Sequence, residues 1–267
     1  MPAALIDSHG LIDSHCHLTF KALSQQLDAV LARADEAGVE RMICVGINVD
    51  DTRASLELAR KHDNLHVAAG IHPHEAGTAT DADLDAINAL LADERVVAAG
   101  EMGLDYHYDF SDHDSQKRIF KAQLDQAVRR DLPVIIHCRE AYDDTIAIME
   151  QADMVDRPVV VFHCFTGTAA EARAVLERGW WLSFTGIVTF KNAAELQAVA
   201  RDYPRDKLMV ETDAPYLSPE PVRNRRPNEP AYVRHTAAFL ADLRNEPLGA
   251  LAESTAANTK AFYRLGG

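Results

Sequence analysis

The sequence is short of basic side chains, and this shortage argues against one class of protein. Lysine and arginine together number 27, against 41 aspartates and glutamates, which gives a formal net charge of −14. A protein that coats nucleic acid is disfavoured, because phosphate backbones are bound by clustered basic side chains. An enzyme that acts on phosphate substrates is not excluded, because bound divalent cations and a local basic loop can reverse the sign of the charge inside a cleft.

Long apolar runs are also missing. No stretch approaches the length of a membrane-spanning helix, and the N-terminus has no basic region followed by an apolar core. We therefore expect a cytoplasmic protein with no membrane partner. Hydrophobic residues still make up 47% of the 267 residues and charged residues 25%, which is typical of a globular protein with a substantial core.

Cysteine is scarce, with four residues in the chain, and three of them directly follow a histidine. Because side chains alternate along a strand, Cys16, Cys138 and Cys164 should point away from those histidines. We interpret them as small apolar residues packed between strands and helices, a common environment of free cysteine. The alternative, that they are thiolate ligands of a metal, is disfavoured by this direction.

Strand-like and helix-like segments alternate along the chain, and no linker divides it. Eight strand–helix pairs in roughly 250 residues are typical of a (β/α)8 (TIM) barrel, so we predict one α/β domain over residues 1–267. A final helix near 247–263 is expected to pack outside the barrel. The predicted strands are 11–18, 41–47, 65–72, 96–102, 133–138, 159–165, 180–188 and 208–213. The predicted helices are 21–37, 51–62, 81–93, 113–130, 141–151, 168–178, 192–201 and 230–243.

A short repeat lies at the start of the chain. Leu5–His9 recurs as Leu11–His15, and either copy could be taken for the first strand. Only the second copy continues to another histidine and leads directly into a helix, so we assign His9 to a tail.

Side chains that can bind a metal follow the apolar runs of several predicted strands. Parallel strands of a barrel end at one rim, so these side chains should converge on a single site at the carboxyl ends of the strands. Each has another possible role when taken alone: the histidines could be core residues, Glu101 could pair with Arg139, and Asp213 could cap a turn. Their joint occurrence favours a metal-dependent hydrolase. The residues are His15, His17, Glu101, His137, His163 and Asp213, with His72 and His74 as possible accessories.

Two of these positions carry a further physical argument. His15 and His17 are two residues apart, so on a strand both imidazoles face the same side and form half of a site for a cation such as Zn²⁺. Glu101 follows small and apolar residues, where burying a carboxylate without compensation is costly. A bridging position between two cations would supply that compensation.

Taken together, the motifs resemble those of the TatD family of metal-dependent nucleases, within the amidohydrolase-type barrels. The match covers nearly the whole chain, and seven ordered motifs are more specific than any one of them. They are Ile12–Leu18, Gly70–His74, Gly100–Tyr106, Pro133–Ala141, His163–Gly167, Ser183–Gly186 and Glu211–Pro215.

The resemblance implies two divalent metal ions, which could be Zn, Mn, Co or Mg. His15, His17, Glu101 and Asp213 would hold one ion, and Glu101, His137 and His163 the other, with Glu101 bridging. Many barrels of this superfamily bridge their metals with a carbamylated lysine, but the fourth predicted strand offers none. We expect the ions to activate a water for attack on phosphorus, with Asp213 as the proton acceptor.

The resemblance also implies cleavage of DNA phosphodiesters, commonly as an exonuclease. Candidate phosphate-binding side chains are Arg139, Arg223, Arg225 and Arg226, each of which could instead be a solvated surface charge. His72 could contact substrate, and Asp105 could orient a ligand histidine. The loop at 223–230 departs from the family pattern Arg-Gly-Lys-Arg-Asn-Glu-Pro, because Asn224 replaces the glycine and Pro227 is added. Its effect on substrate preference is left open.

Three hypotheses follow. The first is a nuclease that acts on DNA ends, as a monomer. The second is a related hydrolase of an ester or amide, such as a D-aminoacyl-tRNA or a lactone, or of a phosphorylated small substrate. The third is a barrel without metal that serves as an interaction scaffold, which is least favoured because a scaffold does not need the complete ligand set.

Overall fold

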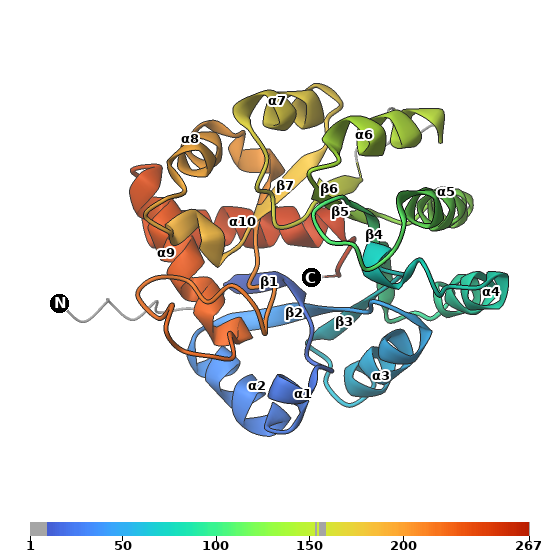
Figure 1. Ribbon diagram of the computed structural model, residues 1–267. Helices are drawn as coiled ribbons and strands as arrows, with labels where there is room; N and C mark the ends of the chain where they lie inside the picture. Colours follow the sequence, from blue (N-terminus) through green and yellow to red (C-terminus); the bar gives the residue numbers. More distant parts are fainter. Residues whose placement is uncertain (1–9, 153, 155–158, 267) are drawn as a thin grey trace.

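The computed structural model describes residues 10–152, 154 and 159–266. Within them, eight parallel strands pair in chain order, β1 to β8, and helices surround them (Figure 1). This is the predicted (β/α)8 barrel. His9 lies outside the described residues. The strands are β1 (Leu11–Cys16), β2 (Val39–Val45), β3 (Leu65–Ala69), β4 (Val96–Asp105), β5 (Val134–Arg139), β6 (Val160–Phe162), β7 (Trp181–Phe184) and β8 (Leu208–Val210).

The barrel is closed between β8 and β1 by the chain that follows β8. The amide of Asp213 donates to the carbonyl of His15 at 2.9 Å, and the amide of His17 donates to the carbonyl of Ala214 at 2.7 Å. Cys16 and Ala214 form a parallel bridge between these bonds. The closure therefore places Asp213 beside His15 of β1 and His17, which follows the strand.

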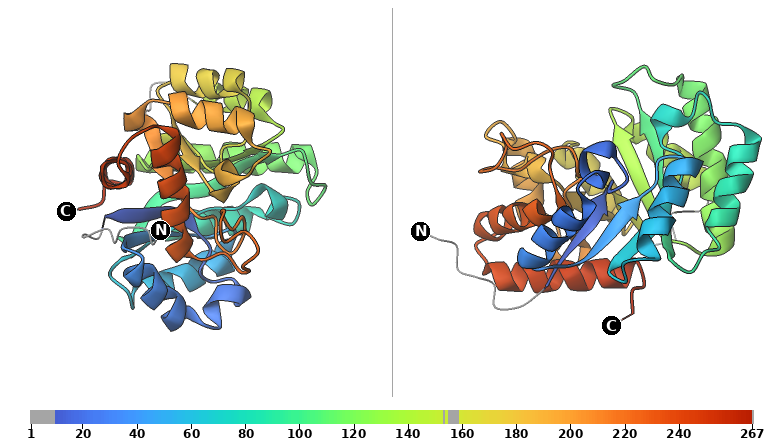
Figure 2. Two further views of the ribbon diagram at one scale, coloured as in Figure 1. Left: turned by 90° about the vertical axis from the view of Figure 1, so that its left-hand side faces the viewer. Right: turned by 90° about the horizontal axis from the view of Figure 1, so that it is seen from below.

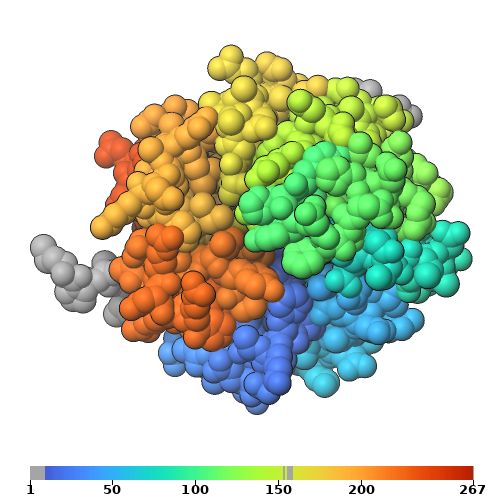
Figure 3. All heavy atoms as spheres, viewed as in Figure 1, coloured from blue at the N-terminus to red at the C-terminus, as the bar shows by residue number. Residues whose placement is uncertain are grey.

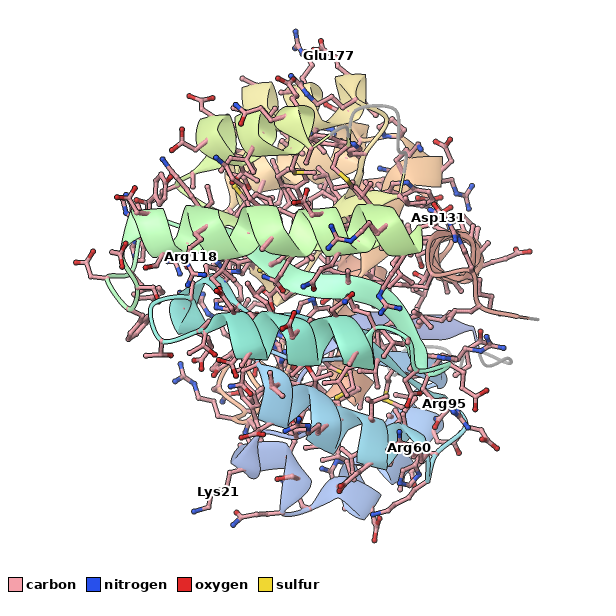
Figure 4. All side chains as sticks on the ribbon, turned by 90° about the vertical axis from the view of Figure 1, so that its right-hand side faces the viewer. Lys21, Arg60, Arg95, Arg118, Asp131 and Glu177 are labelled. Carbon is pink, nitrogen blue, oxygen red and sulfur yellow. The ribbon has the colours of Figure 1, made fainter. Side chains whose placement is uncertain are left out.

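The helices form the outer layer, and their charged side chains point away from the barrel (Figure 4). The bounds of α5 are those predicted, but the helix predicted over 21–37 is two helices. None of the helices among the described residues is long and apolar enough to cross a membrane. The α-helices are α1 (Lys21–Ser24), α2 (Leu27–Glu36), α3 (Val49–Ala59), α4 (Asp81–Leu90), α5 (His113–Arg130), α6 (Tyr142–Gln151), α7 (Ala169–Glu177), α8 (Ala194–Asp202), α9 (Val233–Leu243) and α10 (Leu248–Phe262). Short 3₁₀ turns are η1 (Pro73–Glu75), η2 (Gly186–Thr189), η3 (Arg205–Lys207) and η4 (Pro230–Tyr232).

The prediction of a strand over 180–188 is wrong in its second half. β7 ends at Phe184, and the Thr185 side chain then accepts a hydrogen bond from the amide of Ile187, which starts the 3₁₀ turn η2. A local side-chain bond of this kind competes with continuation of the strand.

The last helix was predicted to pack outside the barrel. It does so at one particular place, where it covers the amino-terminal end of the strands (Figure 2). Asn258 donates to the carbonyl of Leu208 at the start of β8, at 2.8 Å. The Tyr263 hydroxyl donates to the carbonyl of Ser14 at 3.1 Å. Phe262 and Tyr263 join the buried cluster inside the barrel, with Ile43, Val45, Ala68, Ala98, Ile135, Val161 and Met209. Access to the interior is therefore left to the carboxyl ends of the strands.

Candidate metal centre

A cleft of about 1080 Å³ lies at the carboxyl ends of the strands and is lined by His17, Glu101, His137, His163 and Asp213, among others. Figure 3 views this face, which is hollowed where segments from distant parts of the sequence meet. His15 lies beneath the lining, fully buried at the end of β1. The structure thus brings together all six residues that were predicted as metal ligands, from within β4 and β5 and from the ends of β1, β6 and β8 or the residues that follow them.

One half of the site gathers His15 and His17 around one oxygen of Glu101 and one oxygen of Asp213. Nε2 of His15 lies 3.2 Å from Nε2 of His17 and 3.3 Å from Oε2 of Glu101. Oδ1 of Asp213 lies 3.4 Å from Nε2 of His17 and 3.8 Å from Nε2 of His15. Ligand atoms arranged as a tetrahedron around a zinc ion are about 3.4 Å apart, since each bond is about 2.1 Å. These four side chains therefore fit one divalent cation.

The other half uses the second oxygen of the same glutamate. Oε1 of Glu101 lies 2.6 Å from Nε2 of His163 and 2.9 Å from Nδ1 of His137. The two imidazole nitrogens are 3.4 Å apart. Glu101 thus directs one oxygen to each group of imidazoles, the geometry that a bridging carboxylate needs. The donor set, imidazole nitrogen and carboxylate oxygen, fits two divalent cations.

The electrostatics of the site keep its carboxylates ionised. Glu101 is 2% exposed, and burial alone would raise its pKa. The imidazole of His163 is the largest opposing influence, and the pKa of Glu101 is held well below its usual range. Burial likewise opposes ionisation of Asp213, but His17 and His15 lower its pKa. Both groups are therefore available as anionic ligands at neutral pH.

Asp105 lies beside the second half of the site and contacts His137, as an orienting carboxylate would, and the role itself stays a prediction. Its Oδ2 accepts from Nε2 of His137 and from Nε2 of His74, each at 2.9 Å. Its Oδ1 accepts from the amides of His107 and Tyr108, each at 3.0 Å. A carboxylate on the far nitrogen fixes the tautomer of a ligand histidine, so Nδ1 of His137 is left with its lone pair toward the site.

His72 reaches the site as a donor. Its Nδ1 accepts a hydrogen bond from the amide of His74 at 3.0 Å, so the proton of the neutral ring is on Nε2. That nitrogen lies 3.4 Å from Oε1 of Glu101 and 3.3 Å from Nδ1 of His137. Burial lowers the pKa of His72 to about 4, so the ring is neutral. This tautomer suits a hydrogen bond to a substrate oxygen better than ligation of a metal.

Two buried carboxylates beneath the site had no role in the sequence analysis. Oε1 of Glu211 accepts from the amide of Cys164 at 2.7 Å and lies 3.5 Å from Nδ1 of His163. Asp13 accepts from the amide of Thr212 at 2.8 Å, and burial raises the pKa of Asp13 to about 8. Their place within the motifs Ile12–Leu18 and Glu211–Pro215 is the only sequence signal that could have pointed to them.

The cysteine prediction holds for two of its three residues. Cys16 and Cys138 are buried in the cluster between strands and helices, although Cys138 also borders the cleft. Cys164 is half-buried, lies outside that cluster and lines the cleft, with a φ of 45°. β6 ends at Phe162, so strand alternation does not extend to this position.

A close approach of β4 and β5 positions the second half of the site. Gly103 has a φ of 143°, and a Cβ there would overlap the carbonyl oxygen of His137. Glycine permits both the backbone conformation and the approach. Glu101 and Asp105 are thereby placed on either side of His137.

The four arginines predicted to bind phosphates lie in three different places. Arg139 lines the cleft, and its guanidinium carbon lies 4.8 Å from the centre of the Tyr108 ring. The guanidinium of Arg223 lies over Phe190 at 3.8 Å. Arg225 and Arg226 line a separate surface hollow. Their roles remain predictions, and Arg139 is the one of the four that lines the cleft.

Comparison with known proteins agrees with this geometry. A sequence profile described as TatD related DNase matches residues 12–264. The chain is 39% identical to the uncharacterized metal-dependent hydrolase YabD of Bacillus subtilis, over 96% of this chain and 99% of that one. It is 35% identical to the 3'-5' ssDNA/RNA exonuclease TatD of Salmonella typhimurium, with the same coverage. The crystal structure of YJJV, a TatD homologue of Escherichia coli, superposes with a TM-score of 0.90 at 30% identity, over 96% of this chain and 98% of that one. The chain therefore belongs to the TatD related DNase family.

Proposed function

We propose that this chain is a divalent-metal-dependent hydrolase that cleaves phosphodiester bonds at the ends of nucleic-acid strands. The observation that carries the proposal is the division of the two Glu101 oxygens between two groups of imidazoles at the floor of the cleft. Family membership and the name of the Salmonella relative, 3'-5' ssDNA/RNA exonuclease, support the substrate class. Because α10 covers the other end of the barrel, a strand would enter and leave on the same face.

When bound, two divalent cations would lower the pKa of a water and offset the charge of the phosphate. His15, His17, Glu101, His137, His163 and Asp213 would hold them. Asp213 directs Oδ1 toward His17 and stays ionised, so its other oxygen would take the proton of the attacking water. Asp213 is held in place by the bond from its own amide to the carbonyl of His15.

Two further side chains would position the substrate. The Nε2 proton of His72 would be donated to a phosphate oxygen, since that nitrogen faces the site and the ring is neutral. Arg139 would supply a positive charge at the wall of the cleft. We also propose that the chain acts as a cytoplasmic monomer, which light scattering of the purified protein and cell fractionation would test.

A second candidate function has one observation in its favour. Beyond the predicted ligands and Asp105, the cleft is lined by Glu75, Glu140 and Glu171, and among the described residues Arg139 is its single lysine or arginine. An acidic lining suits a small or uncharged substrate better than a polyanion. A lactone, an aminoacyl ester or a phosphorylated small substrate therefore remains the alternative to a nucleic-acid strand.

The test compares substrates and variants under the same conditions. Purified protein is analysed for metals and then assayed on 5'-labelled single-stranded DNA and RNA, on a lactone and on an aminoacyl ester. We expect about two divalent ions per chain and release of nucleotides, both lost with chelator and in Glu101→Gln. Glu177→Gln, an exposed carboxylate at the end of α7 (Figure 4), is the matched control. Nucleotide release that persists in chelator would reject the proposal, and release from the ester alone would select the alternative.

A further inference from the structure

The large apolar side chains that are most exposed among the described residues all gather at the cleft. Tyr108 is 41% exposed, Phe110 67% and Tyr216 53%, and each lines the cleft above the candidate metal centre. Phe20, which is half-buried, lines it too. Aromatic rings that remain exposed at a concave site often mark a binding surface.

These rings form two walls, one next to each half of the site. The β4 wall comprises Tyr108 and Phe110, whose ring centres are 5.4 Å apart. The β8 wall comprises Phe20 and Tyr216, whose ring centres are 6.1 Å apart. The walls come from distant parts of the sequence, the loop after β4 on one side and the segments after β1 and β8 on the other.

Each wall is connected to a different half of the site. Phe110 lies 4.7 Å from the ring of His74, which shares the Asp105 carboxylate with His137. On the other side, Phe20 stacks on His17 with ring centres 4.9 Å apart. The amide of Tyr216 donates to the carbonyl of Asp213 at 2.9 Å. A phosphate that reacts between the two halves of the site would therefore have one aromatic wall next to each half.

The charges of the cleft indicate what these walls bind. A strand held by its phosphates needs a row of cations, but within the described part of the chain Arg139 is the single lysine or arginine in the lining. Glu75, Glu140 and Glu171 repel phosphates. Bases offer an uncharged alternative, because every base has a flat face that stacks on an aromatic ring. In a duplex, neighbouring base pairs cover those faces, so a wall of this kind favours unpaired strands.

We infer that the β4 wall and the β8 wall each stack one unpaired base, one on either side of the reacting phosphate. The inference rests on the proposed nuclease function and deepens it, because it names the smallest substrate unit as two unpaired nucleotides. Arg139, over the ring of Tyr108, contributes to the β4 wall as a flat cation.

The experiment measures binding, so that its result does not depend on turnover. The full chain loaded with Mn²⁺ is titrated with fluorescent oligothymidylate whose phosphorothioate linkages resist cleavage. A strand of the same length with abasic sugars has the same charge but no bases. We expect the oligothymidylate to bind at least about 25-fold more tightly than the abasic strand, since each of the two stacked bases contributes roughly 5- to 150-fold.

The variants Phe110→Ala and Tyr216→Ala should each reduce that ratio severalfold, and the double variant should bring it close to one. Both side chains are largely exposed, so neither variant should unfold the barrel. Phe110→Trp should restore the ratio, and Arg118→Ala, on the outer face of α5 (Figure 4), is the matched control. The logarithm of affinity should fall with the logarithm of salt with a slope of about −1.4, as expected for two phosphate contacts.

Equal binding of the two strands by the unaltered protein, or a ratio that the aromatic variants leave unchanged, would overturn the inference. A salt slope near −3.5 would do the same, because it would indicate about five phosphate contacts. Failure of the proposed function is a separate result. In that case the protein would prefer the strand with bases but would not cleave the ordinary phosphodiester form of it.

Discussion

Replacing Asp105 with asparagine should weaken metal binding at the site while leaving the barrel folded. Each oxygen of Asp105 accepts two hydrogen bonds, Oδ2 from His137 and His74 and Oδ1 from the amides of His107 and Tyr108. Asparagine has one accepting oxygen, so at one end of the side chain an amide NH₂ group would face two donors. His137 would then lose the partner that fixes its tautomer, or the loop would shift to restore it.

The size of the effect follows from these contacts. Removing the partner of a ligand histidine typically lowers metal affinity about 10- to 100-fold, which is about 1.4 to 2.7 kcal/mol. The loss of one hydrogen bond to a charged group costs a similar amount, about 1.5 to 3 kcal/mol. Competition with a chromophoric zinc chelator would measure the affinity, and circular dichroism would monitor the fold. Asp109→Asn, exposed on the same loop, is the matched control. A folded Asp105→Asn protein with unchanged affinity would refute the orienting role.

Three further predictions concern stability. Gly103→Ala should destabilise the protein by at least about 3 kcal/mol in urea unfolding, because the new Cβ overlaps the His137 carbonyl and the backbone has a positive φ; a change below 1 kcal/mol would contradict this. Phe262→Ala should cost about 3 to 5 kcal/mol, measured by thermal and urea denaturation, because it removes a ring from the cluster that fills the barrel, and an unchanged midpoint would count against that packing. Burial and two neighbouring arginines lower the pKa of His66 to about 4, below its unfolded value near 6.5. Protonation therefore favours the unfolded state, and the contribution of His66 to the free energy of unfolding is lost as pH falls from 6.5 to 4. Allowing for the partial exposure of His66, the variant His66→Gln should gain about 1 kcal/mol of unfolding free energy over the unaltered protein at pH 4.5, compared with pH 7.5. Unfolding free energies of the two proteins that change in parallel with pH would contradict the assignment.

The sequence was sufficient to predict the barrel and the convergence of six side chains. Strands and helices alternate, and polar residues follow the apolar runs, so the rim of a parallel barrel was the one place where His15, His137 and Asp213 could meet. The bounds of α5 were also predictable, because its helical period is strong and Asp112 caps its start. These features depend on local pattern and on the topology of the fold.

Other features depend on contacts that the sequence does not display. β6 ends at Phe162, and the cysteine two residues later turns into the cleft instead of away from it. The sequence of the final helix does not indicate that Phe262 enters the barrel. A ring buried inside the barrel and a ring buried between the helix and the outside of the barrel give the same apolar pattern in the sequence. Arg225 is in the basic loop next to the site in sequence, yet the fold of that loop places it in another hollow.

The charge of the molecule connects the chemistry of the site with the binding of substrate. The chain carries a formal charge of −14, and the rim of the cleft adds Glu75, Glu140 and Glu171 to the acidic ligands below. An anionic strand would be repelled from such a cleft in the absence of cations. Two divalent ions would add four positive charges where the reacting phosphate must lie, so the same ions would be needed for attraction and for hydrolysis. Away from the reacting phosphate the cleft offers aromatic rings in place of cations, and this arrangement favours a substrate with unpaired bases.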